Sequence, residues 1–205
     1  TSAMDGVLVV DKPQGMTSHD VVDFMRRRFG LKKVGHAGTL DPMATGVLVL
    51  LIGRYTRSSS TFMSADKEYE GTMTLGGRSD TGDADGAITK SNAALDFDRG
   101  AIEAAFKKFR GEIEQIPPRY SAIKIGGRRL YELTRSGHVV DCPPRRVTIY
   151  SIEIADWRAD ELTLDISCSK GTYVRSLAHD LGEALGCGAL VEELRMDALL
   201  PGAPL

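Results

Sequence analysis

The stretch VGHAGTLDPMATG, residues 34–46, runs directly into the aliphatic segment VLVLLI, residues 47–52. It contains three glycines, one histidine (His36) and one acidic residue, Asp41. Pro42 disfavours the helical region for the residue before it, so Asp41 is expected to be extended, and the glycines allow a close approach of the backbone. The pattern predicts a loop that fixes one carboxylate ahead of a buried strand. Asp41 then either caps a neighbouring N–H as a turn residue or serves chemistry.

The composition is that of a globular protein of one domain or at most two small ones. Of the 205 residues 42% are apolar, and the longest apolar run, residues 47–52, is far too short to span a bilayer. The apolar run at residues 7–10 lacks the basic segment of a signal peptide. Three widely spaced cysteines argue against a disulfide framework and a zinc site: Cys142, Cys168 and Cys187. We therefore expect a cytoplasmic protein without a membrane segment.

The charge is distributed unevenly, although the formal net charge is only −2. Residues 24–57 carry seven basic side chains against one acid and are +6, and residues 117–146 carry seven against two acids and are +5. Such segments either present basic faces to phosphate or form ordinary solvated faces of helices and loops.

Hydrophobic periodicity predicts three helices. They are expected between an N-cap of Thr17 or Ser18 and Gly30, between an N-cap of Asp98 and Gly111, and over residues 172–185. The apolar residues on their inner faces are Val21, Val22, Met25 and Phe29, then Ile102, Ala105, Phe106 and Phe109, then Tyr173, Leu177, Leu181 and Leu185.

Short apolar or alternating runs predict the strands. They are a buried strand at 6–10, a buried strand at 47–52, a half-exposed strand at 67–75, and an antiparallel pair at 147–156 and 161–168. Residues 76–86 are expected to be loop, and the proline-containing stretch 117–146 an extended insertion. The elements lack a βαβ rhythm, so we expect an α+β fold with a mixed, largely antiparallel central sheet flanked by helices. The sequence contains no nucleotide-binding fingerprint.

The acidic stretch SDTGDADG, residues 79–86, resembles part of a calcium loop. Asp83 and Asp85 match two ligand positions, but Thr81 and Asn92 stand where an EF-hand needs Asp and a bidentate Glu. Turn chemistry is therefore the favoured interpretation, and a calcium-dependent module the alternative.

Five blocks resemble the TruB type of pseudouridine synthases, the enzymes that make pseudouridine in the T loop of tRNA. The central signature is GHAGTLDPMATGVL; the other four are VLVVDKPQGMTSHDVV, DKEYEGTMTLGGRSDTGDADG, IPPRYSAIKIGGRRLYELTRSG and CSKGTYVRSLAHDLGEALGCGALVEELR. They cover essentially the whole chain in order. The resemblance implies one catalytic domain at 4–205, with 117–146 as a basic, thumb-like RNA-binding insertion. The C-terminal PUA domain of many members is not evident, and the final LRMDALLPGAPL departs from their basic stretch.

The implied reaction is an isomerisation, so the resemblance predicts no cofactor and no metal. The N1–C1′ bond of uridine is broken, and the rotated base is rejoined through C5. Asp41 matches the catalytic aspartate, which attacks C1′, adds at C6 or removes a proton from C2′. The sequence leaves these routes open.

The resemblance also implies roles for residues around a flipped base. His36 fills the vacated space, Tyr69 stacks on the uracil, and Arg175 pairs with Asp41. The other implied site residues are Tyr173 and Leu194 at the substrate, Lys12 as loop support or phosphate contact, and Asp83 as loop support. Without the resemblance, Tyr69 is a packing aromatic, His36 a hydrogen-bonding loop residue, and Arg175 an exposed arginine that points away from the helix core.

The basic insertion is expected to grip the T stem-loop of tRNA. Its contact residues are Arg119, Lys124, Arg128, Arg129 and Arg135. We expect a monomer that acts on tRNA. The alternatives are a non-catalytic RNA binder, a calcium module on Asp80, Asp83 and Asp85, and a relative that works inside a guide-RNA complex.

Overall fold

The computed structural model describes residues 4–121, 123–138 and 140–200. Its helices are α1 (Ser18–Phe29), α2 (Ser59–Met63), α3 (Arg99–Lys107), α4 (Leu130–Arg135), α5 (Val174–Ala184) and the 3₁₀-helix η1 (Gly53–Ser58). Its strands are β1 (Gly6–Lys12), β2 (Val34–Ala37), β3 (Thr45–Ile52), β4 (Asp66–Leu75), β5 (Gly77–Ser79), β6 (Ile88–Lys90), β7 (Gly111–Gln115), β8 (Lys124–Ile125), β9 (Arg128–Arg129), β10 (Arg145–Arg158), β11 (Glu161–Cys168) and β12 (Ala189–Leu200).

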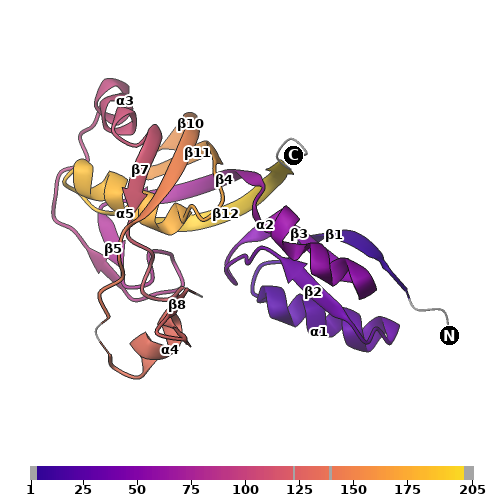
Figure 1. Cartoon of the computed structure of the whole chain (residues 1–205). Helices are drawn as coiled ribbons and strands as arrows, with labels where there is room; N and C mark the ends of the chain where they lie inside the picture. Colours follow the sequence, from indigo (N-terminus) through magenta and orange to yellow (C-terminus); the bar gives the residue numbers. More distant parts are fainter. Residues whose placement is uncertain (1–3, 122, 139, 201–205) are drawn as a thin grey trace. The chain divides into compact units, whose positions relative to one another are not determined.

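The chain forms two compact units, and the main sheet has strands in both (Figure 1). Among the described residues, unit 1 holds residues 4–70 and 193–200, and unit 2 holds those between 71 and 192. The sheet has the order β1-β3-β12-β4-β11-β10-β7, and β2 pairs with β3 beside this path. The pairs β1/β3, β2/β3, β10/β11 and β10/β7 are antiparallel, and β12/β3 is parallel. The expected α+β class with a mixed, largely antiparallel sheet is confirmed.

Helix α1 begins and ends at the predicted residues. Thr17 is the N-cap: its side chain accepts from the backbone N–H of Asp20, whose carboxylate accepts from the N–H of Thr17. Gly30 ends the helix in the left-handed conformation, at φ 62°. Val21 and Val22 are buried, as expected. Phe29 is 56% exposed, which corrects its predicted inward position; it is the last residue of the helix, directly before the cap.

Strands β2 and β3 form a hairpin in unit 1. The register runs from Val34 opposite Ile52 to Ala37 opposite Val49, so residues 38–44 form the connecting loop. Phe62 of α2 packs against the buried cluster of Ala37, Val49 and Leu51. The prediction missed β2 because its four residues lie inside a segment rich in turn residues.

Strand β1 is present, but the prediction that it is buried is wrong. Val7, Leu8 and Val9 are exposed. The reason is its place in the sheet, since β1 is the terminal strand and its pairing is with β3.

The other predicted elements lie wholly or partly in unit 2. The antiparallel pair β10/β11 is confirmed, and α3 and α5 bury Ile102, Phe106, Leu177 and Leu181. Two expectations need correction. Residues 77–79 form β5, paired with β6, and the insertion is not wholly extended. It contains the hairpin β8/β9 and helix α4, whose Leu130 and Leu133 are buried.

Gly46 is a position in the sheet of unit 1 that has no room for a side chain. Its φ is +101°, and a Cβ there would overlap the carbonyl oxygen of Met196 on the neighbouring strand β12. Backbone strain alone costs about 1–3 kcal/mol. We expect Gly46→Ala to lower the free energy of unfolding by at least about 3 kcal/mol, which lowers Tm by about 2–4 °C per kcal/mol in a chain of this size.

The matched control is Gly15→Ala. Gly15 also has a positive φ, +90°, but a Cβ there would meet no atom within 4 Å. Thermal unfolding should show a clearly smaller loss for Gly15→Ala, and equal losses would contradict the overlap at Met196.

Candidate active site

Asp41 lies in the loop between β2 and β3. Its side chain is half-buried, while Met43 and Ala44 after it are buried. The backbone turns at this point, because the N–H of Ala44 donates to the carbonyl of Asp41 at 3.0 Å. The loop is therefore seated on the core through its apolar residues, and Asp41 lies at the edge of that core.

Ser18 fixes the residue before Asp41. It is the first residue of α1 and is buried. Its Oγ accepts from the backbone N–H of Leu40 at 2.9 Å and donates to the Leu40 carbonyl at 3.3 Å. Both backbone groups of Leu40 are thus held by one hydroxyl at the start of a capped helix.

Lys12 fixes the residue after Asp41. Its side chain is completely buried, and Nζ donates to the carbonyls of Pro13 at 2.9 Å, Pro42 at 3.3 Å and Met16. The N–H of Gly15 donates to the same Pro42 carbonyl at 2.7 Å. This geometry favours loop support over phosphate contact as the role of Lys12.

The ammonium of Lys12 also shapes the local electrostatics. Burial lowers the pKa of Lys12, and the negative charges of Asp41 and Asp20 oppose that shift. The same attraction acts on the Asp41 carboxylate, because a Coulomb interaction is shared by both partners. Asp41 is therefore fixed by hydrogen bonds to its neighbours in sequence and attracted by a buried cation.

Three further predicted site residues belong to unit 1. His36 lies in β2, half-buried, and its Nδ1 is 3.0 Å from the carbonyl oxygen of Gly38. Tyr69 of β4 and Leu194 of β12 are buried, with 8% and 7% of their surface exposed. The hydrogen bond of His36 is the one expected of a loop residue, and it also orients the ring at the start of the Asp41 loop.

Arg175 and Asp83 lie together in unit 2. Arg175 is 4% exposed, so the expectation that it points away from the core is wrong. Its guanidinium donates to the carbonyls of Thr81 at 3.0 Å and Tyr120 at 3.3 Å, and its Nε is 3.9 Å from Asp83 Oδ2. The physical reason is the turn formed by the acidic stretch at residues 79–86, here called the acidic turn. The Thr81 carbonyl and the Asp83 carboxylate of this turn lie next to the guanidinium of Arg175.

Tyr173 precedes α5 and is held by a residue that sequence reasoning missed. The amide of the buried Gln115, at the end of β7, accepts from the N–H of Tyr173 at 3.0 Å and donates to its carbonyl at 3.2 Å. Ser176 donates to the carbonyl of Ile116 at 2.7 Å. The start of α5 is thereby joined to the residues that directly precede the insertion. The sequence offered one signal for this role, because Gln115 stands directly before an isoleucine and two prolines, residues 116–118.

The insertion presents its basic residues to solvent. Arg119, Lys124, Arg128, Arg129 and Arg135 are all exposed. The guanidinium groups of Arg129 and Arg135 lie 5.9 and 5.7 Å from the centre of the Tyr131 ring. The hydroxyl of Thr134 on α4 donates to the carbonyl of Arg119 at 3.0 Å. The insertion is therefore a small folded surface with exposed cations.

The acidic turn has a structural explanation. Asp80 Oδ1 accepts from the N–H of Ala87 at 2.8 Å, and Asp83 Oδ1 accepts from the hydroxyl of Thr81 at 2.7 Å and the N–H of Asp85 at 3.1 Å. Within the described ranges, Asp80, Asp83 and Asp85 do not converge as a set of metal ligands.

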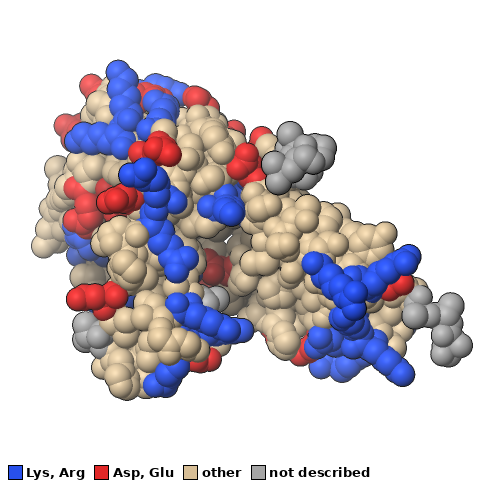
Figure 2. Space-filling view, in the orientation of Figure 1, with Lys and Arg blue, Asp and Glu red and all other residues tan. Residues whose placement is uncertain are grey.

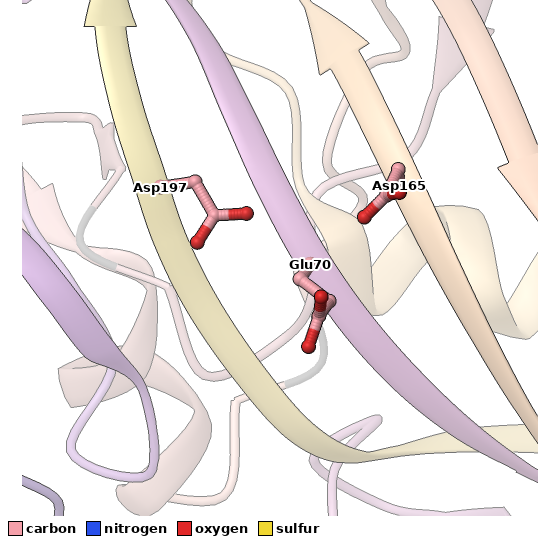
Figure 3. A group of neighbouring side chains, drawn as sticks. All are labelled: Glu70, Asp165 and Asp197. Atoms are coloured by element: carbon pink, nitrogen blue, oxygen red, sulfur yellow. The ribbon is translucent and has the colours of Figure 1, made fainter. Parts of the chain in front are cut away.

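Exposed acids also occur on the strands. Figure 3 shows Glu70 of β4, Asp165 of β11 and Asp197 of β12. In unit 1, Nε of Arg195 is 3.7 Å from Asp197. The hydrogen bonds that Arg195 donates to Asp11, with the added negative charge of Asp197 and Glu70, raise the pKa of Arg195. Exposed carboxylates that neighbour an arginine are ordinary surface chemistry, and we assign no metal to them.

None of the helices in the described ranges has the length and apolarity that a membrane crossing requires.

Comparison with known proteins assigns the chain to a family. The family model described as TruB family pseudouridylate synthase (N terminal domain) matches residues 26–174. The chain is 50% identical over 192 residues to tRNA pseudouridine synthase B of Dechloromonas aromatica (strain RCB). It is 48% identical over 195 residues to the protein of the same name from Opitutus terrae (strain DSM 11246 / JCM 15787 / PB90-1). These alignments cover 94% and 95% of the chain, and 64% and 81% of the relatives.

Solved structures share the fold of this chain. A chain of the Cbf5-Nop10-Gar1 complex has a TM-score of 0.74 and 34% identity, over 95% of this chain and 48% of that chain. A chain of an H/ACA RNP bound to a substrate RNA containing 2′-deoxyuridine has a TM-score of 0.69 and 31% identity, over 95% and 47%. The chain thus spans about half of these chains and 64% of the D. aromatica relative. It belongs to the TruB family of pseudouridylate synthases.

Proposed function

We propose that this chain isomerises a uridine in the T loop of tRNA to pseudouridine, with Asp41 as the catalytic carboxylate. The observation that carries the proposal is the fixation of the Asp41 loop on both sides of this residue, by Ser18 at Leu40 and by Lys12 at Pro42. Family membership supports the reaction class. If Asp41 only capped a neighbouring backbone group, the buried side chains of Ser18 and Lys12 would not be needed to hold the residues before and after it.

The reaction exchanges one glycosidic bond for another within the nucleotide. The N1–C1′ bond breaks, the base turns, C5 bonds to C1′, the proton of C5 leaves to a base, and N1 is protonated. A carboxylate serves each of the three possible first steps, which are attack at C1′, addition at C6 and removal of a proton from C2′. No oxidant, reductant or second substrate enters this balance.

The target base must leave its stack, at a cost of a few kcal/mol. In the proposal Tyr69 stacks on the uracil, which contributes about 1–3 kcal/mol, Leu194 lines its pocket and His36 fills the vacated space. The pairing of Arg175 with Asp41 joins residues of the two units and stays a prediction. Tyr173 completes the substrate-binding set, and Asp83 supports Arg175 through the contact within unit 2.

Removal of the carboxylate tests the proposal directly. We expect Asp41→Asn to lower the rate of pseudouridine formation at least about a thousandfold, because the nucleophile or base is lost. The measurement maps pseudouridine in an unmodified tRNA transcript by carbodiimide adducts and primer extension, with a metal chelator present. Asp96→Asn is the control, since Asp96 is an exposed loop carboxylate. Full activity of Asp41→Asn would contradict the catalytic role of Asp41, and RNA binding by the wild type without product would favour a non-catalytic binder.

Ser18 is a positioning residue, and its effect is separable from stability. Ser18→Ala removes both bonds to Leu40, so we expect kcat to fall about 10–100-fold while KM changes little, because misplacement of a reacting group by 1 Å costs about this much. Thr17→Ala is the matched control. It removes the N-cap of the same helix, at about 1 kcal/mol, without touching Leu40. Equal losses of kcat in both variants would show that helix stability, not loop position, is responsible.

The insertion is proposed to bind the T stem-loop through its phosphates. We expect the triple variant Lys124→Gln, Arg128→Gln, Arg129→Gln to weaken binding of a T-arm hairpin at least about tenfold and to reduce the salt dependence, because each lost phosphate contact lowers the log–log slope by about 0.7–0.9. The control triple is Arg99→Gln, Lys107→Gln, Lys108→Gln at α3, where all three residues are exposed. An equal effect of the two triples would contradict a specific role for the insertion.

A further inference from the structure

We propose that unit 1 carries a second RNA-binding surface, which contacts the phosphodiester backbone of the substrate outside the T-arm hairpin. We name it the α1–η1 basic surface. Its residues are Arg27, Arg28, Lys32, Lys33, Arg54 and Arg57, all exposed. The inference rests on the proposed function, since the RNA is the tRNA substrate proposed there.

Three segments are joined to make this surface. The guanidinium of Arg26, in the last turn of α1, donates to the carbonyl of Val34 at 2.7 Å. The N–H of Leu31 donates to the carbonyl of Arg26 at 3.1 Å, and the N–H of Gly53 donates to the carbonyl of Lys33 at 2.9 Å. The end of α1, the turn at residues 30–33 and the start of η1 therefore lie together, and Figure 2 shows blue side chains gathered over this end of unit 1.

The positive charge of this surface is largely uncompensated. Asp41 is the only acidic residue between Asp23 and Asp66 in the sequence. Asp23 lies 3.3 Å from Arg26 and Asp5 lies 3.3 Å from Arg54. In the described part of the chain no carboxylate is within 4.0 Å of the remaining cations: Arg27, Arg28, Lys32, Lys33 and Arg57. Like charges held this close repel one another and favour a polyanionic partner.

The needs of the fold explain only part of this charge. Cations in the last turn of a helix complement its dipole and stabilise the helix. This accounts for arginines at the end of α1, but Lys32, Lys33 and Arg57 lie outside that helix. Their convergence with Arg27 and Arg28 is what a phosphate backbone requires.

Aromatic side chains are interleaved with these cations. Phe29 is 56% exposed with the Arg28 guanidinium 5.5 Å from its ring centre, and Tyr55 is 39% exposed with the Arg54 guanidinium at 6.0 Å. Exposed rings beside arginines offer stacking surfaces for sugars and unpaired bases. An RNA strand can use both features, whereas a simple counterion atmosphere uses only the charge.

The surface lies at the opposite end of the β2/β3 hairpin from Asp41. Val34 and Ile52 pair next to the surface, and Ala37 pairs with Val49 before the Asp41 loop. Strand β3 has eight residues, and the seven steps between its first and last residue, at about 3.4 Å per step, span roughly 24 Å. A uridine placed at Asp41 is therefore about one strand length from the surface, and in this proposal the RNA that reaches the surface lies outside the T-arm hairpin.

The test compares two RNAs and two sets of variants. The patch triple, Arg28→Gln, Lys33→Gln, Arg57→Gln, takes one cation from each segment, and the Arg99, Lys107, Lys108 triple is again the control. We expect the patch triple to weaken binding of a full-length tRNA transcript at least about tenfold and to lower its salt slope by about 2–3. Binding of the isolated T-arm hairpin should change less than about twofold, because in the proposal the hairpin makes no phosphate contact with this surface.

The outcomes separate this inference from the proposed function. A loss below twofold on full-length tRNA, a loss equal to that of the control triple, or equal losses on tRNA and hairpin would each overturn it. Wild-type pseudouridine formation on the hairpin reports on the proposed function alone. Retained affinity for tRNA with lost binding to anionic vesicles would assign the surface to a membrane instead.

Discussion

The buried ammonium of Lys12 is the constraint on which the site of unit 1 depends. A charged amine taken out of water costs several kcal/mol unless hydrogen bonds and opposite charge replace its hydration. Three backbone carbonyls accept from Nζ, and two carboxylates add favourable charge. A loop conformation that withdrew Pro42 would leave a buried cation with fewer partners. The lysine and the Asp41 loop therefore fix each other.

This constraint explains how a glycine-containing loop becomes a precise one. Glycines give the segment no preferred conformation of their own. Order is supplied from outside, by Ser18 on the residue before Asp41 and by Lys12 on the residue after it. Because Ser18 begins a helix with a capping box, its hydroxyl is itself held in place. A reacting carboxylate gains from such preorganisation, since none of the cost of ordering falls on the reaction step.

The parts predictable from sequence were those with local signals. Thr17 and Gly30 marked the ends of α1, and alternation marked β10 and β11. Strand β12 was missed because its parallel pairing with β3 joins residues far apart in sequence. Arg175 was misplaced because a charged residue off an apolar stripe is normally solvated. Its burial depends on carbonyl groups of the acidic turn and the insertion, which no local pattern of α5 contains.

In unit 1, the buried Lys12 and the exposed cations of the α1–η1 basic surface act over different distances. At 0.1 M salt the Debye length is about 10 Å, well below the roughly 24 Å that β3 spans. The cations of the α1–η1 basic surface are therefore screened from Asp41 and do not set its charge state. That task falls to Lys12, which is buried and poorly screened. Substrate attraction and the electrostatics of the carboxylate are thus separable in this fold, although both arise from the segment around one β-hairpin.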